Sequence, residues 1–159
     1  MKFNYYAFKA IYLHEMDRFK RTLMQSLLSP VLSTSLYFIV FGSVIGGYVE
    51  NIDGISYGSY IVPGLLMLTL LTQSISNTSF GIFFPKFNGT IYEILAAPIS
   101  TLEIVLAFVG AGATKTLIVG FVIFITATFF VEVDVKYPLL MIFLLLLVAF
   151  TFALFDFLI

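Results

Sequence analysis

Residues Pro85 to Glu103, PKFNGTIYEILAAPISTLE, form a polar interval in the middle of a chain that is otherwise almost continuously apolar. Two stretches of the form S/T-x-x-E lie in it, Thr90 to Glu93 and Ser100 to Glu103. Each predicts a helix start, because the hydroxyl and the carboxylate can satisfy free backbone N–H groups reciprocally. Pro98 has no N–H and disfavours helix at the residue before it. The interval therefore predicts a short helix that begins at Ile91 and ends by about Ala97, and a long helix that starts at Thr101.

Composition places the chain among integral membrane proteins. Of its 159 residues, 60% are hydrophobic and 11% are charged, whereas soluble domains average about 45–50% and about 25%. The sequence has no cysteine, which excludes disulfides, thiolate catalysis and cysteine-bound metal, and its single histidine cannot form a histidine cluster. We therefore expect no metal site, no catalytic residues and no enzyme activity in this chain.

The first 22 residues predict an amphipathic helix at the membrane interface. They contain five of the eight basic residues, and apolar residues recur among them at helical spacing. A basic helix of this kind lies in the headgroup plane with its apolar face towards the lipid. The basic residues are Lys2, Lys9, Arg18, Lys20 and Arg21, and the apolar ones are Tyr5, Phe8, Tyr12, Met16, Phe19 and Leu23.

Four apolar runs predict membrane-spanning helices, since about 20 apolar residues cross a hydrocarbon core of about 30 Å. Their expected ranges are 23–49, 57–84, 104–131 and 139–159. No linker or fixed-period repeat divides the chain, so residues 1–159 are expected to form one all-α membrane domain. The sequence ends within the fourth run without a polar anchor, and we expect it to be the first part of a longer membrane protein.

The distribution of basic residues predicts the orientation in the membrane. The N-terminal segment and the central polar interval hold six Lys and Arg residues together, whereas the loops after the first and third spans hold only Lys136. Cytoplasmic loops carry an excess of Lys and Arg. The N-terminus and the central short helix are therefore expected in the cytoplasm.

Residues 110–116, GAGATKT, resemble a phosphate-binding loop only superficially. The pattern G-x-x-x-x-G-K-[ST] anchored on Lys115 would need glycines where Val109 and Thr114 stand. The segment also lies inside an expected span, where no soluble strand-to-helix turn can form. The chain is therefore not expected to bind ATP or Mg²⁺ itself, or any other cofactor.

Small and polar residues within the spans predict helix contacts. Gly112, Thr116 and Gly120 fall on one helix face and form a small-residue ridge on which another helix can pack closely. A polar patch at residues 72–79 can supply hydrogen bonds between helices or line a translocation pathway, and both interpretations stay open.

Two charged residues lie inside the expected spans, Lys115 and Asp156. Lys115 is placed near the middle of its span, where insertion of a lysine costs roughly 2.5–3.5 kcal/mol. It is either a pathway residue for an anionic substrate or a structural cation paired with an acid such as Asp156. The sequence favours neither hypothesis.

A basic interfacial helix, paired spans and a short cytosolic helix between spans two and three resemble the ABC-2 type permeases, the membrane subunits of a class of ATP-binding-cassette exporters. Residues 84–104 look like the family's stretch G-T-x-E-x-L-x-x-P-x-S, with one extra residue between Thr90 and Glu93. YFIVFG at 37–42 and YIVPG at 60–64 also look like family segments, in the branch of multidrug or daunorubicin-type export permeases. The resemblance covers the whole chain and implies a six-span fold whose last two spans lie beyond it.

The resemblance also implies partners. In such permeases the cytosolic helix is a coupling helix that docks on a separate nucleotide-binding ATPase subunit, which alone binds ATP and Mg²⁺. Two permease copies and two ATPases form the exporter in the bacterial inner membrane, in contact with lipid and without nucleic acid. The N-terminal helix 1–22 corresponds to the family's elbow helix, and residues 86–97 to its coupling helix. The coupling residues would be Lys86, Phe87, Asn88, Gly89, Thr90, Ile91, Tyr92 and Glu93.

Two functions from different classes therefore remain. The first is the permease subunit of an ABC exporter, which moves a hydrophobic or amphipathic substrate, or a glycan, outward. The alternative is a non-transporting membrane scaffold or assembly protein that docks a cytosolic partner through the 86–97 helix. A secondary transporter would predict inverted repeats and paired broken helices, and neither is visible in the sequence.

Overall fold

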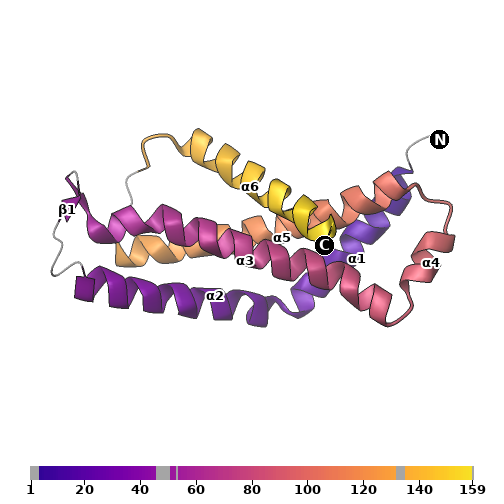
Figure 1. The fold of residues 1–159 in the computed structure, drawn as a ribbon, viewed down its shortest axis with the longest axis horizontal. Helices are drawn as coiled ribbons and strands as arrows, with labels where there is room; N and C mark the ends of the chain where they lie inside the picture. Colours follow the sequence, from indigo (N-terminus) through magenta and orange to yellow (C-terminus); the bar gives the residue numbers. More distant parts are fainter. Residues whose placement is uncertain (1–3, 46–50, 53, 132–134, 159) are drawn as a thin grey trace.

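The computed structural model describes residues 4–45, 51–52, 54–131 and 135–158, and it shows an elongated bundle of helices (Figure 1). A two-stranded antiparallel turn, which pairs Asn51 with Ser56, is the sole departure from helix among the described elements. This confirms the all-α membrane fold. The elements are α1 Tyr5–Arg21, α2 Leu23–Tyr37, the π-helix η1 Phe38–Ile45, β1 Asn51–Ile52, β2 Ile55–Ser56, α3 Tyr57–Phe87, α4 Ile91–Ala96, α5 Thr101–Phe130 and α6 Pro138–Leu158.

Within the described part of the chain, four helices are long and apolar enough to cross a membrane. They are Leu23–Gly42, Tyr57–Phe87, Thr101–Phe130 and Pro138–Leu158. The second continues past its expected end at residue 84 and includes Pro85 in its last turn. A proline at this place removes one backbone hydrogen bond at the end of the helix and leaves the earlier turns intact. The expected end of the first span at residue 49 lies outside the described residues.

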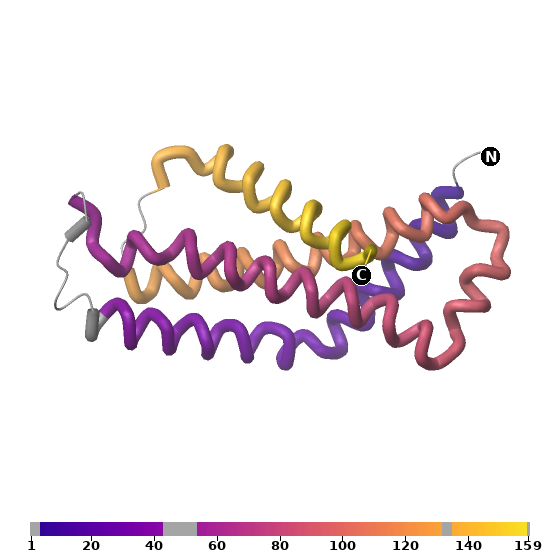
Figure 2. Tube along the Cα trace, in the orientation of Figure 1, coloured from indigo at the N-terminus to yellow at the C-terminus, as the bar shows by residue number. Residues whose placement is uncertain are grey.

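The α5 helix is the centre of the bundle and packs against α1, α2, α3 and α6 (Figure 2). Its small-residue ridge faces α3 as predicted. A Cβ at Gly120 would lie 2.7 Å from Leu70 Cδ2, and one at Gly112 would overlap the Thr78 hydroxyl. The two helices therefore run antiparallel at close approach, with Thr78 beside Gly112 and Leu70 beside Gly120.

The α1 helix lies alongside the first half of α5 in parallel register. Three polar contacts connect them, and each joins residues about 100 positions apart: Asn4 N–H to Glu103 Oε1 at 2.5 Å, Tyr12 Oη to Thr114 Oγ1 at 3.0 Å and Lys115 Nζ to Glu15 Oε2 at 2.7 Å. Phe19, one turn after Glu15, is buried with residues of α2, α3 and α5. This corrects the expectation that the whole aromatic face lies on the lipid, because part of that face is buried against the bundle.

The α5 helix begins as the sequence predicts. The Ser100 hydroxyl accepts a hydrogen bond from Glu103 N–H, and the Glu103 carboxylate accepts one from Ser100 N–H at 2.9 Å, which completes a capping box. The predicted box at Thr90 is absent. Thr90 already has helical backbone angles, φ −61° and ψ −21°, and its side chain makes no capping hydrogen bond, whereas a capping residue needs an extended backbone.

Ser100 and Thr90 give a matched test of this difference in capping. Replacing Ser100 by alanine is expected to reduce the free energy of unfolding by about 0.5–2 kcal/mol, because the Glu103 N–H in the first turn of α5 loses its side-chain partner. Replacing Thr90 by alanine should leave stability nearly unchanged. Denaturant unfolding of both variants in detergent measures the difference, and equal losses would contradict the capping assignment.

Candidate coupling site and buried ion network

The α4 helix protrudes at one end of the bundle, where it connects the ends of α3 and α5 (Figure 1). The short β1 and β2 strands lie at the opposite end (Figure 1). The α3 helix has 31 residues and α5 has 30, so each is about 45 Å long at about 1.5 Å per residue. This exceeds a hydrocarbon core of about 30 Å, and α1 packs beside the portion of α5 next to α4. The α4 end is therefore carried on two helices that are each longer than the thickness of the core.

The structure divides the predicted coupling residues among three elements. Lys86 and Phe87 form the last residues of α3, residues 88–90 make a turn, and α4 begins only at Ile91. The helix that the family resemblance implies over residues 86–97 is thus shortened to Ile91–Ala96, in agreement with the start at Ile91 and the end by about Ala97 that the residues themselves predict. The physical reason is Gly89, whose φ of +77° is left-handed and cannot continue a helix.

The tip formed by the end of α3 and by α4 presents large side chains to its surroundings. No residue of α4 is buried. Phe87 is 77% exposed, Tyr92 73% and Leu95 60%, and Lys86 and Glu93 are exposed beside them. Apolar side chains gathered with charges at a protruding tip are typical of a surface that binds another protein.

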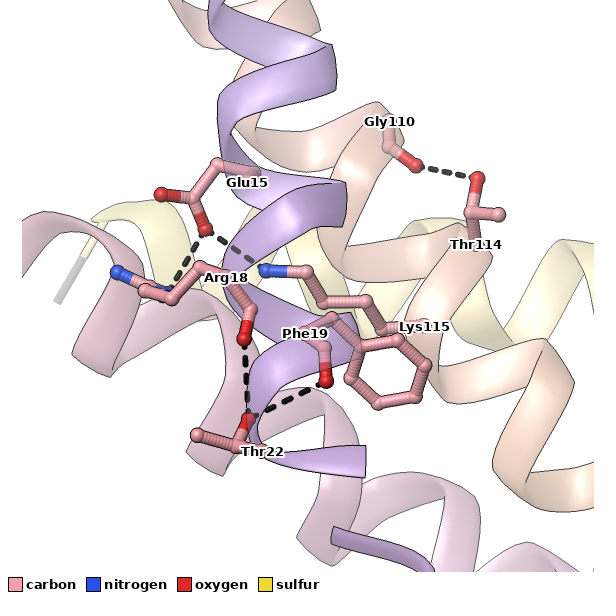
Figure 3. A network of polar contacts seen from close by, with 7 residues as sticks. All are labelled: Glu15, Arg18, Phe19, Thr22, Gly110, Thr114 and Lys115. Carbon is pink, nitrogen blue, oxygen red and sulfur yellow. Dashed lines mark hydrogen bonds and ion pairs between the residues drawn. The ribbon is translucent and has the colours of Figure 1, made fainter. Parts of the chain in front are cut away.

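A buried ion network connects α1 to α5 (Figure 3). The Glu15 carboxylate accepts a hydrogen bond from Lys115 Nζ at 2.7 Å and forms an ion pair with Arg18 Nη2 at 2.8 Å through the same oxygen. Glu15 and Lys115 are 3% and 2% exposed. Gly81 of α3 lies against the network, since a Cβ there would be 3.5 Å from both Glu15 Oε2 and Arg18 Nη2. Three helices therefore enclose the charges.

The network identifies the partner of Lys115, which is Glu15 rather than Asp156. The buried ion pair favours the hypothesis of a structural cation, which stays a prediction. The parallel alignment of α1 with α5 brings Glu15 to Lys115, whereas Asp156 on α6 is directed towards Ser74 of α3. The structure thus keeps the two intramembrane charges apart.

Sequence reasoning missed Glu15 and Arg18 as members of this network. A signal was present, because Glu15 falls three residues after Tyr12 and four before Phe19 and so shares the apolar face of its helix. An acid on that face, one turn from Arg18, is unusual in a helix that otherwise carries bases on its polar side. Such an acid needs a buried partner, and Lys115 was the unpaired base available in the spans.

Two features agree with one family of membrane proteins. A short helix, α4, protrudes between two long spans, and the amphipathic helix α1 packs on the third span, α5. The sequence profile of the family described as "ABC-2 type transporter" matches residues 6–159. The chain belongs to the ABC-2 type transporter family. The fold and the family resemblance inferred from the sequence are both confirmed by this match.

Two curated relatives show how similar the chain is to known proteins. The chain is 39% identical over 129 residues to the inner membrane transport permease YadH of Escherichia coli strain K12, which covers 81% of this chain and 50% of YadH. It is 26% identical over 121 residues to nodulation protein J of Neorhizobium galegae, covering 75% of this chain and 46% of that protein. The chain thus spans about half the length of these curated relatives. No solved structure matches it.

Proposed function

We propose that this ABC-2 family chain is a permease subunit of an ATP-binding-cassette exporter in the bacterial inner membrane. Its role is to couple ATP hydrolysis on a separate nucleotide-binding subunit to outward transport of a substrate. The observation that carries the proposal is the exposed α4 tip, which joins two spans directly and has no buried residue of its own. The name of the YadH relative, an inner membrane transport permease, supports the same function.

The contacts around α4 suggest how a partner would move the spans. The capping box fixes the start of α5 next to α4, and the same Glu103 carboxylate accepts the Asn4 N–H of the segment before α1. The α1 helix is in turn held to α5 by the ion network. A displacement of α4 by a docked ATPase would therefore tilt α5 and α1 together, and α3 through its direct connection. The ATPase subunit binds ATP and Mg²⁺, and this chain supplies the mechanical response.

The opposite end of the bundle offers a place for an apolar substrate. A groove of about 1410 Å³ opens there between α3 and α6, and aromatic residues of several helices line it. Tyr37, Tyr60, Phe124 and Tyr137 are among these residues. Such a lining supports a hydrophobic or amphipathic substrate. The proposed assembly contains two permease copies and two ATPases, with the N-terminus and α4 in the cytoplasm.

The test is the double substitution Tyr92→Ala with Glu93→Ala, in the full-length protein co-purified with the nucleotide-binding ATPase subunit that it is proposed to bind. An exposed interface aromatic contributes about 2 kcal/mol when it is a central contact, so we expect the affinity for the ATPase to fall about tenfold or more. The permease-dependent increase in ATPase rate should fall with it. Both are measured in detergent or nanodiscs, by affinity capture and by phosphate release.

The matched control is Phe129→Ala, since Phe129 is an exposed aromatic residue near the opposite end of the bundle and does not line the groove. It should leave association and ATPase stimulation unchanged. Unaltered association in the Tyr92 and Glu93 variant would remove the coupling assignment. Association that depends on Tyr92 without any ATPase stimulation by the unmodified protein would instead support the scaffold alternative.

A further inference from the structure

Four buried side chains from three helices lack hydrogen-bond partners. They are Ser74 and Thr78 of α3, Thr116 of α5 and Asp156 of α6. In the described part of the chain no hydrogen bond of ordinary geometry reaches the hydroxyl oxygens or Asp156 Oδ2, although the Ser74 hydroxyl lies close to the Asp156 carboxyl. Their residues are between 0% and 6% exposed. A buried polar group without a partner costs free energy, and a buried carboxylate costs most. The position therefore calls for a bound species.

The C-terminal end of α6 lies against α3 and α5 (Figure 2), and the contacts of individual residues place the four side chains in this region. The Thr78 hydroxyl and the Ala153 Cβ both lie next to Gly112. Asp156 follows Ala153 by three residues on the buried face of α6, and its carboxyl is close to the Ser74 hydroxyl. Because Thr78 lies beside Gly112 and Leu70 beside Gly120, the antiparallel register places Thr116 opposite Ser74.

The hydroxyl groups in this place behave differently from others on the same helices. Thr69 and Thr72 of α3 donate to the carbonyls of Leu65 and Leu68, and Thr114 of α5 donates to Gly110. This local bond is the usual way in which a helical threonine is satisfied. The hydroxyls of Ser74, Thr78 and Thr116 make no such bond. Their oxygens are thus available to a ligand.

The ionisable group at this place is a single carboxyl without a basic partner. The ion pairs of the described residues join Glu15 to Arg18, Glu15 to Lys115 and Asp17 to Lys20, and none of them includes Asp156. Lys115, a buried base of the same bundle, is already paired with Glu15. A unit negative charge in an apolar bundle is compensated most fully by a unit positive charge held against it.

We propose that Ser74, Thr78, Thr116 and Asp156 form a binding site for one monovalent metal cation. The ligands are all oxygen atoms, which suit hard cations rather than copper, zinc or other metals that favour nitrogen and sulfur. One carboxylate balances one unit of charge, whereas a divalent ion would leave a net charge buried. A proton on Asp156 would satisfy only one of the hydroxyl oxygens, while a metal cation can contact all four side chains. The site holds α3, α5 and α6 together and does not depend on the proposed transport function.

The test compares the thermal unfolding midpoint of the full-length protein in detergent, in NaCl, KCl and N-methylglucamine chloride at equal ionic strength and pH. A bound metal cation predicts a saturable rise of several degrees in NaCl or KCl over N-methylglucamine, which is too large to enter. Asp156→Asn should abolish the rise. Thr78→Val, which keeps the shape of the side chain, should weaken the apparent cation affinity at least about tenfold.

Matched controls separate the site from general salt effects. Thr72→Val changes a threonine of α3 whose hydroxyl is already satisfied, and Asp17→Asn changes an exposed acid. Both should keep the full response to Na⁺ or K⁺. Equal midpoints in all three salts would overturn the proposal and indicate that a proton or water fills the place. A response that persists in both Asp156→Asn and Thr78→Val would overturn it as well.

Discussion

Replacing Glu15 by glutamine is expected to lower the free energy of unfolding by about 3–5 kcal/mol, since removal of one partner leaves an uncompensated buried charge. The charge left behind is Lys115, which is 2% exposed and has no other acid within ion-pair distance among the described residues. Arg18 then adds repulsion, because it lies against the same carboxylate in the unmodified protein. The measurement is denaturant unfolding in detergent.

Removing the other partner of the pair, Lys115, should lower the free energy of unfolding by less. In Lys115→Met the Glu15 carboxylate keeps Arg18 as a partner, so the loss should be clearly smaller than in Glu15→Gln. The double variant Glu15→Gln with Lys115→Met should recover most of the stability, because it leaves no unpaired buried charge. The surface pair Lys20 and Asp17 supplies the control, since breaking an exposed pair costs about 1 kcal/mol or less. Equal losses in the two single variants, without recovery in the double variant, would contradict the network.

Replacing Gly112 by alanine is expected to destabilise the bundle by about 1–3 kcal/mol, because a methyl group inserted into a packed contact forces neighbouring atoms to move. A Cβ at Gly112 would overlap the Thr78 hydroxyl and would also touch the Ala153 Cβ at 3.9 Å. The obstruction therefore comes from Thr78 of α3, whereas the contact with Ala153 of α6 has an ordinary van der Waals distance. The loss in the free energy of unfolding is measured by the same denaturant unfolding experiment, in N-methylglucamine chloride.

Gly110→Ala is the matched control, because a Cβ at Gly110 meets no atom within 4 Å. Alanine is also the better helix former, so this variant should be neutral or slightly stabilising. Adding Thr78→Ala to Gly112→Ala removes the hydroxyl that the new methyl would strike, and should restore part of the loss. If Gly110→Ala and Gly112→Ala destabilise equally, the close approach of α3 and α5 is not what makes Gly112 necessary.

The elements of this fold were predictable where the determining interactions are local. The Ser100 capping box and Pro98 fixed the start of α5 and the end of α4, and uninterrupted apolar runs identified the spans. The small-residue ridge was also readable, because Gly112 and Gly120 share a face at helical spacing whatever helix packs on it. The capping and ridge signals lie within about two or three helical turns, and each apolar run lies within a single helix.

The features that sequence reasoning missed depend on distant residues or on one backbone angle. Nothing near Lys115 indicates that its partner is Glu15, 100 residues earlier. The Thr90 box has the right residue types, but the left-handed Gly89 before it brings Thr90 into the helical conformation and removes the cap. Asp156 was noticed as a charge, yet its neighbours Ser74 and Thr116 are set by the packing of three helices.

The 100-residue separation of Glu15 and Lys115 also has a consequence for synthesis. At about 5–20 residues per second a ribosome needs roughly 5–20 s to make the intervening chain. During that time α1 exists without α5, and Arg18, one turn away, is the ion partner that Glu15 already has. When the third span enters the bilayer, Lys115 meets an acid made earlier and held in place. Arg18 thus accompanies Glu15 during translation, and Lys115 completes the network once the third span is inserted.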